Sequence, residues 1–397
     1  MIAIFLIPLY LFFNWYIYKW LVNWMGSCSK YFKSKQSRFI TNLIYGFFAS
    51  SLLIAFILPN IKLKRYLNLI GNYWLGVLLY VIMTVVVFDV IARILYKLKK
   101  IKKDKFSNRR FVIAGAVCIV IIAMISILGV INARIIRTTR YEVNIDKKVP
   151  NINSLNVVMV ADLHMGYNIG YKQMSKMVNL INKENADLVI IAGDIFDNDY
   201  EAIEKPDQMI NLFRNIKSKY GIYAVYGNHD IKEKTLAGFT FNGKDVKESD
   251  ILMDKFLKRS NIELLRDDYV LIENSIYLYG RPDYEKPGRG IIERKTPEEI
   301  TKSMNHQKPI IVIDHEPKEL EELSEAGVDL DLSGHTHDGQ IFPGNIITKI
   351  AWENSCGYLK KGNMHSIVTS GVGLYGPNMR VGTKPEITTI KINFTNN

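Results

Sequence analysis

Four apolar stretches fill the first third of this 397-residue sequence and restrict what it can fold into more than any other feature. They run over residues 2–24, 39–58, 69–92 and 111–131, and each is close to the roughly 20 residues that a helix needs to cross the hydrocarbon core of a bilayer. Helices of a large soluble core would carry charged outer faces, which these stretches lack. The first stretch has no basic residue before it, which argues against a cleaved signal peptide. We therefore predict a transmembrane region with four helices over residues 1–133.

Charge is divided unevenly along the sequence. Up to Lys148 there are 22 Lys and Arg residues against 4 Asp and Glu, whereas the remainder has 29 against 35. The basic residues gather in the loops before residues 39 and 111, and positively charged loops stay in the cytoplasm. We therefore expect both loops inside the cell, and everything after the fourth helix on the extracytoplasmic side of the cell membrane. The acidic balance of the second part argues against nucleic acid as a partner.

The sequence changes character after the apolar region. Residues 134–153 are polar and show no clear period, so we expect a tether there. Over residues 154–397, short β-rich runs alternate with helical stretches, as is typical of a layered α/β domain. The expected strands are 156–161, 188–192, 222–226, 309–313, 328–332, 367–370 and 387–394.

Five motifs directly follow five of these expected strands. They are Asp162-Leu163-His164, Gly193-Asp194-Ile195-Phe196-Asp197, Gly227-Asn228-His229-Asp230, Asp314-His315 and Gly334-His335-Thr336-His337. In open α/β sheets, ligands bind outside the carboxyl ends of the strands. Imidazoles and carboxylates are also common metal ligands. One such motif alone is weak evidence, but five at equivalent places predict a metal site at the edge of the sheet.

In their order, these motifs resemble those of the calcineurin-like metallophosphoesterase superfamily. The resemblance continues to the C-terminus, where residues 370–373, Arg380 and 385–387 are similar to the closing strands of the bacterial membrane-associated phosphodiesterase branch. It implies an α/β fold, namely a four-layer-type β-sandwich flanked by helices. The transmembrane region is not covered by the resemblance.

The resemblance also implies two divalent metal ions. It assigns Asp162, His164 and His337 to one ion, Asn228, His315 and His335 to the other, and Asp194 as the bridge between them. Oxygen ligands mixed with imidazoles suit Mn²⁺, with Fe and Zn²⁺ as alternatives. By the same resemblance, His229 protonates the leaving oxygen or stabilises the charge on it, and Asp197 orients that imidazole.

Two positions depart from the family pattern. Phosphoprotein phosphatases of this superfamily have Arg after the second Asp of Gly-Asp-x-x-Asp as a phosphate clamp, and here that residue is Asn198. This difference favours a phosphodiester over a phosphoprotein as the substrate. Asp338 stands where this branch has Gly, and a short polar residue can adopt the same left-handed backbone.

The sequence thus favours a membrane-anchored phosphoesterase that hydrolyses phosphodiesters of lipid headgroups or of the cell envelope. Its partners would be the lipid bilayer and the diester substrate. One alternative is a sensor or binding module with a metal site coupled to the transmembrane helices. Another is a cytoplasmic nucleotide phosphodiesterase.

Overall fold

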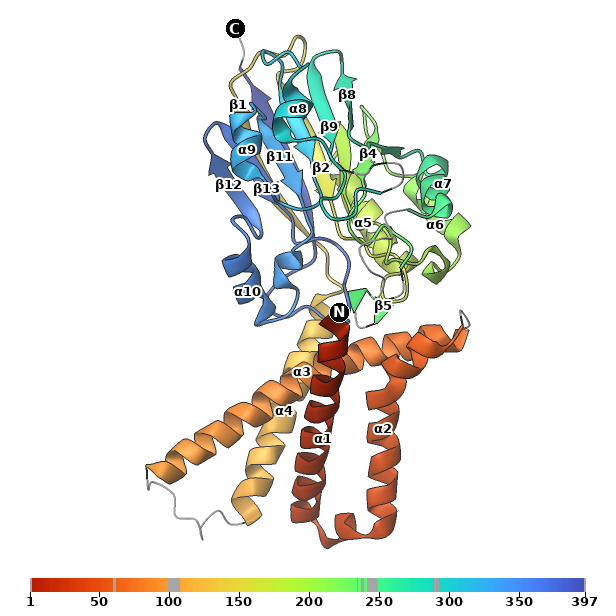
Figure 1. Ribbon diagram of the computed structural model, residues 1–397, viewed down its shortest axis with the longest axis vertical. Helices are drawn as coiled ribbons and strands as arrows, with labels where there is room; N and C mark the ends of the chain where they lie inside the picture. Colours follow the sequence, from red (N-terminus) through yellow and green to blue (C-terminus); the bar gives the residue numbers. More distant parts are fainter. Residues whose placement is uncertain are drawn as a thin grey trace. The chain divides into compact units, whose positions relative to one another are not determined.

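The chain forms two compact units (Figure 1). The computed structural model describes residues 2–59, 62–98, 108–233, 235–236, 239–240, 249–288, 291 and 293–395. Unit 1 consists mainly of the residues up to Ile131, and unit 2 begins at Asn132 and contains most of the rest. The two units are described separately below.

Unit 1 is built from long helices. They are α1 (Ile2–Cys28), α2 (Lys35–Ile57), α3 (Lys62–Lys97) and α4 (Asn108–Asn132), with a short 3-10 turn η1 (Lys30–Lys33) before α2 and a small hairpin of β5 (Thr235–Leu236) and β6 (Phe239–Thr240). Serine side chains fix the turn between the first two helices, because Ser29 caps η1 and Ser34 caps α2. At 1.5 Å per residue, the 36 residues of α3 span about 54 Å. Its ends therefore extend beyond a hydrocarbon core of about 30 Å.

Three of the four predicted membrane spans are supported. Among the described residues, α2, α3 and α4 are long and apolar enough to cross a membrane. The 27-residue helix α1 is long enough to cross a membrane, but it is not among the helices that the described residues support as spans. A fourth span at α1 therefore stays a prediction. Residues 99–107, which supply most of the basic loop before α4, lie outside the described residues.

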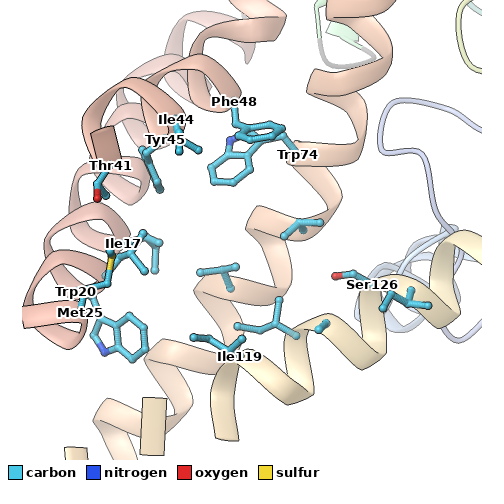
Figure 2. Close-up of a pocket in the computed structure, with 16 residues that line it drawn as sticks. Ile17, Trp20, Met25, Thr41, Ile44, Tyr45, Phe48, Trp74, Ile119 and Ser126 are labelled. Atoms are coloured by element: carbon cyan, nitrogen blue, oxygen red, sulfur yellow. The ribbon is translucent and has the colours of Figure 1, made fainter. Parts of the chain in front are cut away.

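An apolar cavity lies between the helices of unit 1 (Figure 2). Its volume is about 570 Å³, and all four helices contribute side chains, among them Trp20, Tyr45, Trp74 and Ile119. None of the described residues that line it is charged. The cavity therefore offers an ionic substrate no oppositely charged partner, and this part of unit 1 has the character of a hydrophobic anchor.

Unit 2 contains two six-stranded sheets. Sheet 1 has the order β1 (Arg137–Ile145), β14 (Glu386–Phe394), β2 (Ser154–Val160), β3 (Leu188–Ala192), β4 (Ile222–Val225) and β7 (Glu263–Leu264). Sheet 2 has the order β12 (Gly357–Lys361), β13 (Met364–Val368), β11 (Leu330–Ser333), β10 (Ile310–Ile313), β9 (Ile276–Gly280) and β8 (Asp268–Ile272). Within each sheet the central strands are parallel, so their carboxyl ends meet at a common edge.

The two sheets pack face to face, and helices cover their outer faces. Val157, Ile190, Ile311 and Leu332 belong to one buried cluster between the sheets. The other face of sheet 1 packs against α5 (Tyr171–Lys183), α6 (Pro206–Phe213) and α7 (Ile251–Arg259). The outer face of sheet 2 packs against α8 (Pro297–Thr301) and α9 (Leu320–Glu325). The predicted mixed α/β architecture is therefore confirmed for unit 2.

The predicted tether over 134–153 is wrong at residues 137–145, which form a strand. Arg137–Ile145 forms β1, which pairs in parallel with all nine residues of β14. Along β1, Val143 and Ile145 are buried, whereas Glu142 and Asn144 are exposed. This alternation was present in the sequence, but the basic and polar residues of the segment concealed it. The domain therefore begins at Asn132 and not at residue 154.

We predict that unit 2 needs β1 for stability. A fragment of residues 132–397 should fold, whereas a fragment of residues 147–397 should lose about 3–6 kcal/mol of unfolding free energy, because Val143 and Ile145 leave the core. The uncovered edge of β14 should also promote self-association. Urea unfolding and size-exclusion chromatography of both fragments test this, and equal unfolding midpoints would contradict it.

Candidate metal centre

The predicted ligands lie where strands of both sheets end. Sheet 1 supplies Asp162 and His164 after β2, Asp194 after β3, and Asn228 after β4. Sheet 2 supplies His315 after β10, and His335 and His337 after β11. The carboxyl ends of two packed sheets thus bring together side chains that are up to 175 residues apart in sequence.

Most of these ligands have an unusual backbone. Positive φ angles occur at Asp162 (53°), His164 (44°), Asp194 (50°), His335 (70°) and His337 (52°). Residues other than glycine rarely adopt this left-handed region, and each such residue costs on the order of 1–3 kcal/mol. Tight packing around the strand ends must hold these conformations in place. These strained conformations turn the ligand side chains toward a common centre.

The first group of ligands contains Asp162, His164 and His337. Nε2 of His164 lies 3.0 Å from Nε2 of His337, and the latter nitrogen lies 3.6 Å from Oδ1 of Asp162. All three residues are buried. The backbone N–H of His335 donates to both oxygens of Asp162, at 3.1 and 3.2 Å, and so orients that carboxylate.

The second group contains Asn228, His315 and His335. Oδ1 of Asn228 lies 3.2 Å from Nε2 of His315 and 3.1 Å from Nδ1 of His335. These two ring nitrogens are 3.2 Å apart. Nδ1 of His315 lies 2.9 Å from the carbonyl oxygen of Ala192. That contact orients the imidazole so that Nε2 faces the group.

Asp194 lies between the two groups. Its Oδ2 is 3.5 Å from Nε2 of His164 in the first group and 3.3 Å from Nε2 of His315 in the second. The backbone N–H of His229 donates to Oδ1 at 2.8 Å. Burial opposes ionisation of this carboxyl, but the imidazoles of His315 and His229 hold its pKa well below the usual value. Asp194 is therefore an ionised carboxylate in the position that a bridging ligand requires.

The donor set fits two divalent cations. Nitrogen or oxygen donors about 2.1 Å from one octahedral cation would be about 3.0 Å apart, and the spacings within the two groups approach this value. Burial lowers the pKa of His335 to about 3 and also lowers that of His337. Both imidazoles are thus neutral near pH 7, the form that binds a metal. Buried carboxylates supply the negative charge that such ions need.

Two glycines give the ligands the space they need. A Cβ on Gly193 would lie 2.4 Å from Nδ1 of His315, and a Cβ on Gly227 would lie 2.3 Å from Oδ1 of Asp194. Gly193 also has a φ of +81°, which side chains rarely tolerate. The glycines of the second and third motifs are thus required by the close approach of backbone and ligand.

In the structure, His229 has a hydrogen-bond partner that the sequence did not predict. Nδ1 of His229 forms a short hydrogen bond with Oδ1 of Asn198, whose Nδ2 donates to the carbonyl oxygen of Ile231 at 3.1 Å. Asp197, which was expected to orient His229, lies within 4.8 Å of His229, and its Oδ1 is 3.5 Å from Nδ1 of His164. Asn198 has a φ of +59°, which turns its amide beneath the imidazole. The departure from the family pattern is therefore the residue that contacts the proposed catalytic histidine.

Sequence reasoning missed two aromatic residues beside the ligands. The ring of Tyr375 lies 4.9 Å from that of His229 and 5.7 Å from that of His164, and the ring of Trp352 lies 5.1 Å from that of His335. Neither residue belongs to a motif, so nothing in the sequence marked them. Their rings place apolar surface against the imidazoles of the centre.

Arg380 ties the C-terminal loop to the centre. Its guanidinium is fully buried and donates to the carbonyl oxygens of Ser370 at 2.8 Å, Gly373 at 2.9 Å and His337 at 3.3 Å. A buried cation is stabilised when carbonyl oxygens surround it in this way. Arg380 thereby fixes the backbone of His337, a role that the sequence resemblance did not specify.

We predict that Gly227→Ala destroys the metal centre. The added methyl group would displace the Asp194 carboxylate, so bound Mn²⁺ should fall from two ions per chain to one or none. The matched control is Gly170→Ala, because no atom lies within 4 Å of that Cβ position and its φ is −125°. Elemental analysis of both purified variants measures the effect, and undiminished metal in Gly227→Ala would refute it.

Comparison with known proteins agrees with this geometry. Residues 155–339 match the family model of the calcineurin-like phosphoesterases. The chain is similar to a transmembrane protein with a metallophosphoesterase domain from Danio rerio, at 26% identity over 377 residues that cover 89% of this chain and 79% of the relative. It is also similar to a metallophosphoesterase of Helicobacter pylori (strain ATCC 700392 / 26695), at 30% over 268 residues (66% and 65%), and to YkuE of Bacillus subtilis, at 27% over 277 residues (67% and 88%). On these grounds, the chain contains a metallophosphoesterase domain of the calcineurin-like type over residues 155–339.

Proposed function

We propose that this protein is a membrane-anchored phosphodiesterase with two divalent metal ions, which hydrolyses phosphodiesters of lipid headgroups or of the cell envelope. The observation that carries the proposal is the position of Asp194 between two groups of buried ligands. All seven expected metal ligands are present, which favours catalysis over a sensor with a degenerate site.

Each group of ligands would hold one ion. Asp162, His164 and His337 would hold the first, and Asn228, His315 and His335 the second, with Asp194 shared between them. Bound there, the two ions would supply Lewis-acid polarisation of the phosphoryl group and an acidified water as nucleophile.

The remaining chemistry would fall to His229. Its imidazole is buried beside His164 and Tyr375, at ring distances of 5.1 and 4.9 Å. The oxygen of Asn198 accepts a hydrogen bond, so it requires the proton on Nδ1 and leaves Nε2 as the nitrogen that exchanges a proton with the leaving oxygen. Asn198 would thus perform the orienting role first given to Asp197.

The contacts of Asn198 favour a phosphodiester over a phosphomonoester as the substrate. An Arg at this position would clamp the non-bridging oxygens of a phosphomonoester dianion. Asn198 is fully buried, and both ends of its amide are engaged with His229 and Ile231. A diester carries one negative charge fewer and depends less on such a clamp, so the substitution favours a diester.

We predict that the purified full-length chain, loaded with Mn²⁺, hydrolyses bis-p-nitrophenyl phosphate and at least one glycerophospholipid. Asp194→Asn removes the charge shared by both groups and should lower kcat at least about a hundredfold. Asp146→Asn, which changes an exposed aspartate, serves as the matched control. If the wild type turned over neither diester under these conditions, the proposal would fail.

We also propose that unit 2 is on the extracytoplasmic side, as the loop charges favour. A bacterial alkaline phosphatase fused after Asn397 should then be active, because that enzyme needs an oxidising compartment for its disulfides. Green fluorescent protein fused at the same place by the same export route should be dark. A fluorescent fusion together with an inactive phosphatase fusion would place the domain in the cytoplasm.

A further inference from the structure

The helix α10 (Gly344–Ala351) exposes an apolar face that no described residue covers. Ile346 is 49% exposed, Ile347 63% and Ile350 82%, and Phe342 just before the helix is 40% exposed. None of the residues of α10 is buried. Soluble domains rarely expose several large apolar side chains together unless the surface meets a partner or a membrane.

The exposed side chains of α10 lie on one side of the helix. At 100° per residue, positions 346, 347 and 350 fall within an arc of about 100°. Lys349 lies outside this arc, where its long side chain can reach toward lipid phosphates. A short helix with an apolar face and a lysine beside it is typical of segments that lie in a membrane interface.

The position of α10 in the chain ties it to the metal centre. The turn η4 (His337–Gly339), which contains a predicted ligand, precedes it and packs against it. Trp352 ends the helix, with its backbone N–H donating to Thr348 at 3.0 Å, and its ring lies 5.1 Å from that of His335. A ligand of the first group thus precedes the helix, and a residue that contacts a ligand of the second group follows it.

The partner that the chain favours for α10 is the bilayer, because the same chain contains helices long and apolar enough to cross a membrane. The last residue of α4, Asn132, is also the first residue of unit 2, so no linker separates a helix of membrane-spanning character from the domain. The side chain of Asn132 donates to the carbonyl oxygens of Arg380 at 3.0 Å and Thr383 at 2.8 Å. Such a short connection keeps the domain at the membrane, where the effective lipid concentration is high.

We propose that α10, together with Phe342, is an interfacial helix that inserts its isoleucine face into the membrane surface and delivers lipid headgroups to the metal centre. This assigns a membrane phospholipid as the substrate class and rests on the proposed phosphodiesterase function. A soluble protein partner, a second copy of the chain, or unit 1 itself are the other occupants that an experiment must separate from lipid.

A fluorescence experiment tests the membrane contact without relying on activity. In the full-length chain with its three cysteines replaced by alanine, Ile350→Cys carries an environment-sensitive probe, and Lys302→Cys, exposed at the end of α8, is the matched control. In vesicles of phosphatidylglycerol and phosphatidylcholine, nitroxide-labelled lipids should quench the probe at residue 350 at least about threefold more than at residue 302. Equal quenching at the two sites would overturn the proposal, as would a probe at 350 shielded from water but not quenched by lipid.

A second measurement tests delivery of the substrate. Combined Ile346→Ser, Ile347→Ser and Ile350→Ser should lower the ratio of turnover on vesicle phospholipid to turnover on bis-p-nitrophenyl phosphate about tenfold. Ile251→Ser with Leu252→Ser, an exposed apolar pair at the start of α7, is the matched control and should leave this ratio unchanged. An unchanged ratio in the α10 variant would overturn the delivery role. Loss of all turnover in the wild type would instead reject the phosphodiesterase function, and the quenching result would still decide the membrane contact.

Discussion

The candidate metal centre of unit 2 is arranged around one carboxylate that lies near histidines of both ligand groups. Asp194 is buried, ionised and within 3.5 Å of Nε2 of both His164 and His315. A buried charge of this kind is stable only where opposite charge or hydrogen-bond donors surround it. The neighbouring imidazoles and the backbone N–H of His229 partly satisfy it, and two cations would complete the compensation. The left-handed turns and the close glycines are arranged around this residue.

The two positions that depart from the family pattern, Asn198 and Asp338, each have a defined place in the site. Asn198 replaces a phosphate-clamping Arg, and its buried amide instead holds the imidazole of His229. One substitution thus removes a contact to substrate and provides a neutral partner for the proposed acid. Asp338, at a glycine position of the family, has a φ of +49° and so adopts the conformation that a glycine would supply.

Features of both units bear on the proposed substrate. The helices of unit 1 present apolar residues and an apolar cavity, which suit a hydrophobic anchor. Unit 2 follows α4 without a linker and carries the exposed isoleucines of α10 beside the metal centre. A domain held at the bilayer encounters lipid at high local concentration. These features of both units support the proposal that the substrate is a phosphodiester in a lipid headgroup.

From the sequence alone, the candidate metal ligands and the central strands could be predicted. Each ligand type follows a short apolar run, and β3 was predicted to the residue because a fully buried strand is a continuous apolar run. The roles of β1, Asn198, Tyr375 and Trp352 became visible only in the folded structure. The register of β1 depends on β14, some 250 residues later, and the partner of His229 depends on a left-handed turn at Asn198. Such contacts arise from packing between distant segments, whereas strand and ligand patterns are local and can be read along the chain.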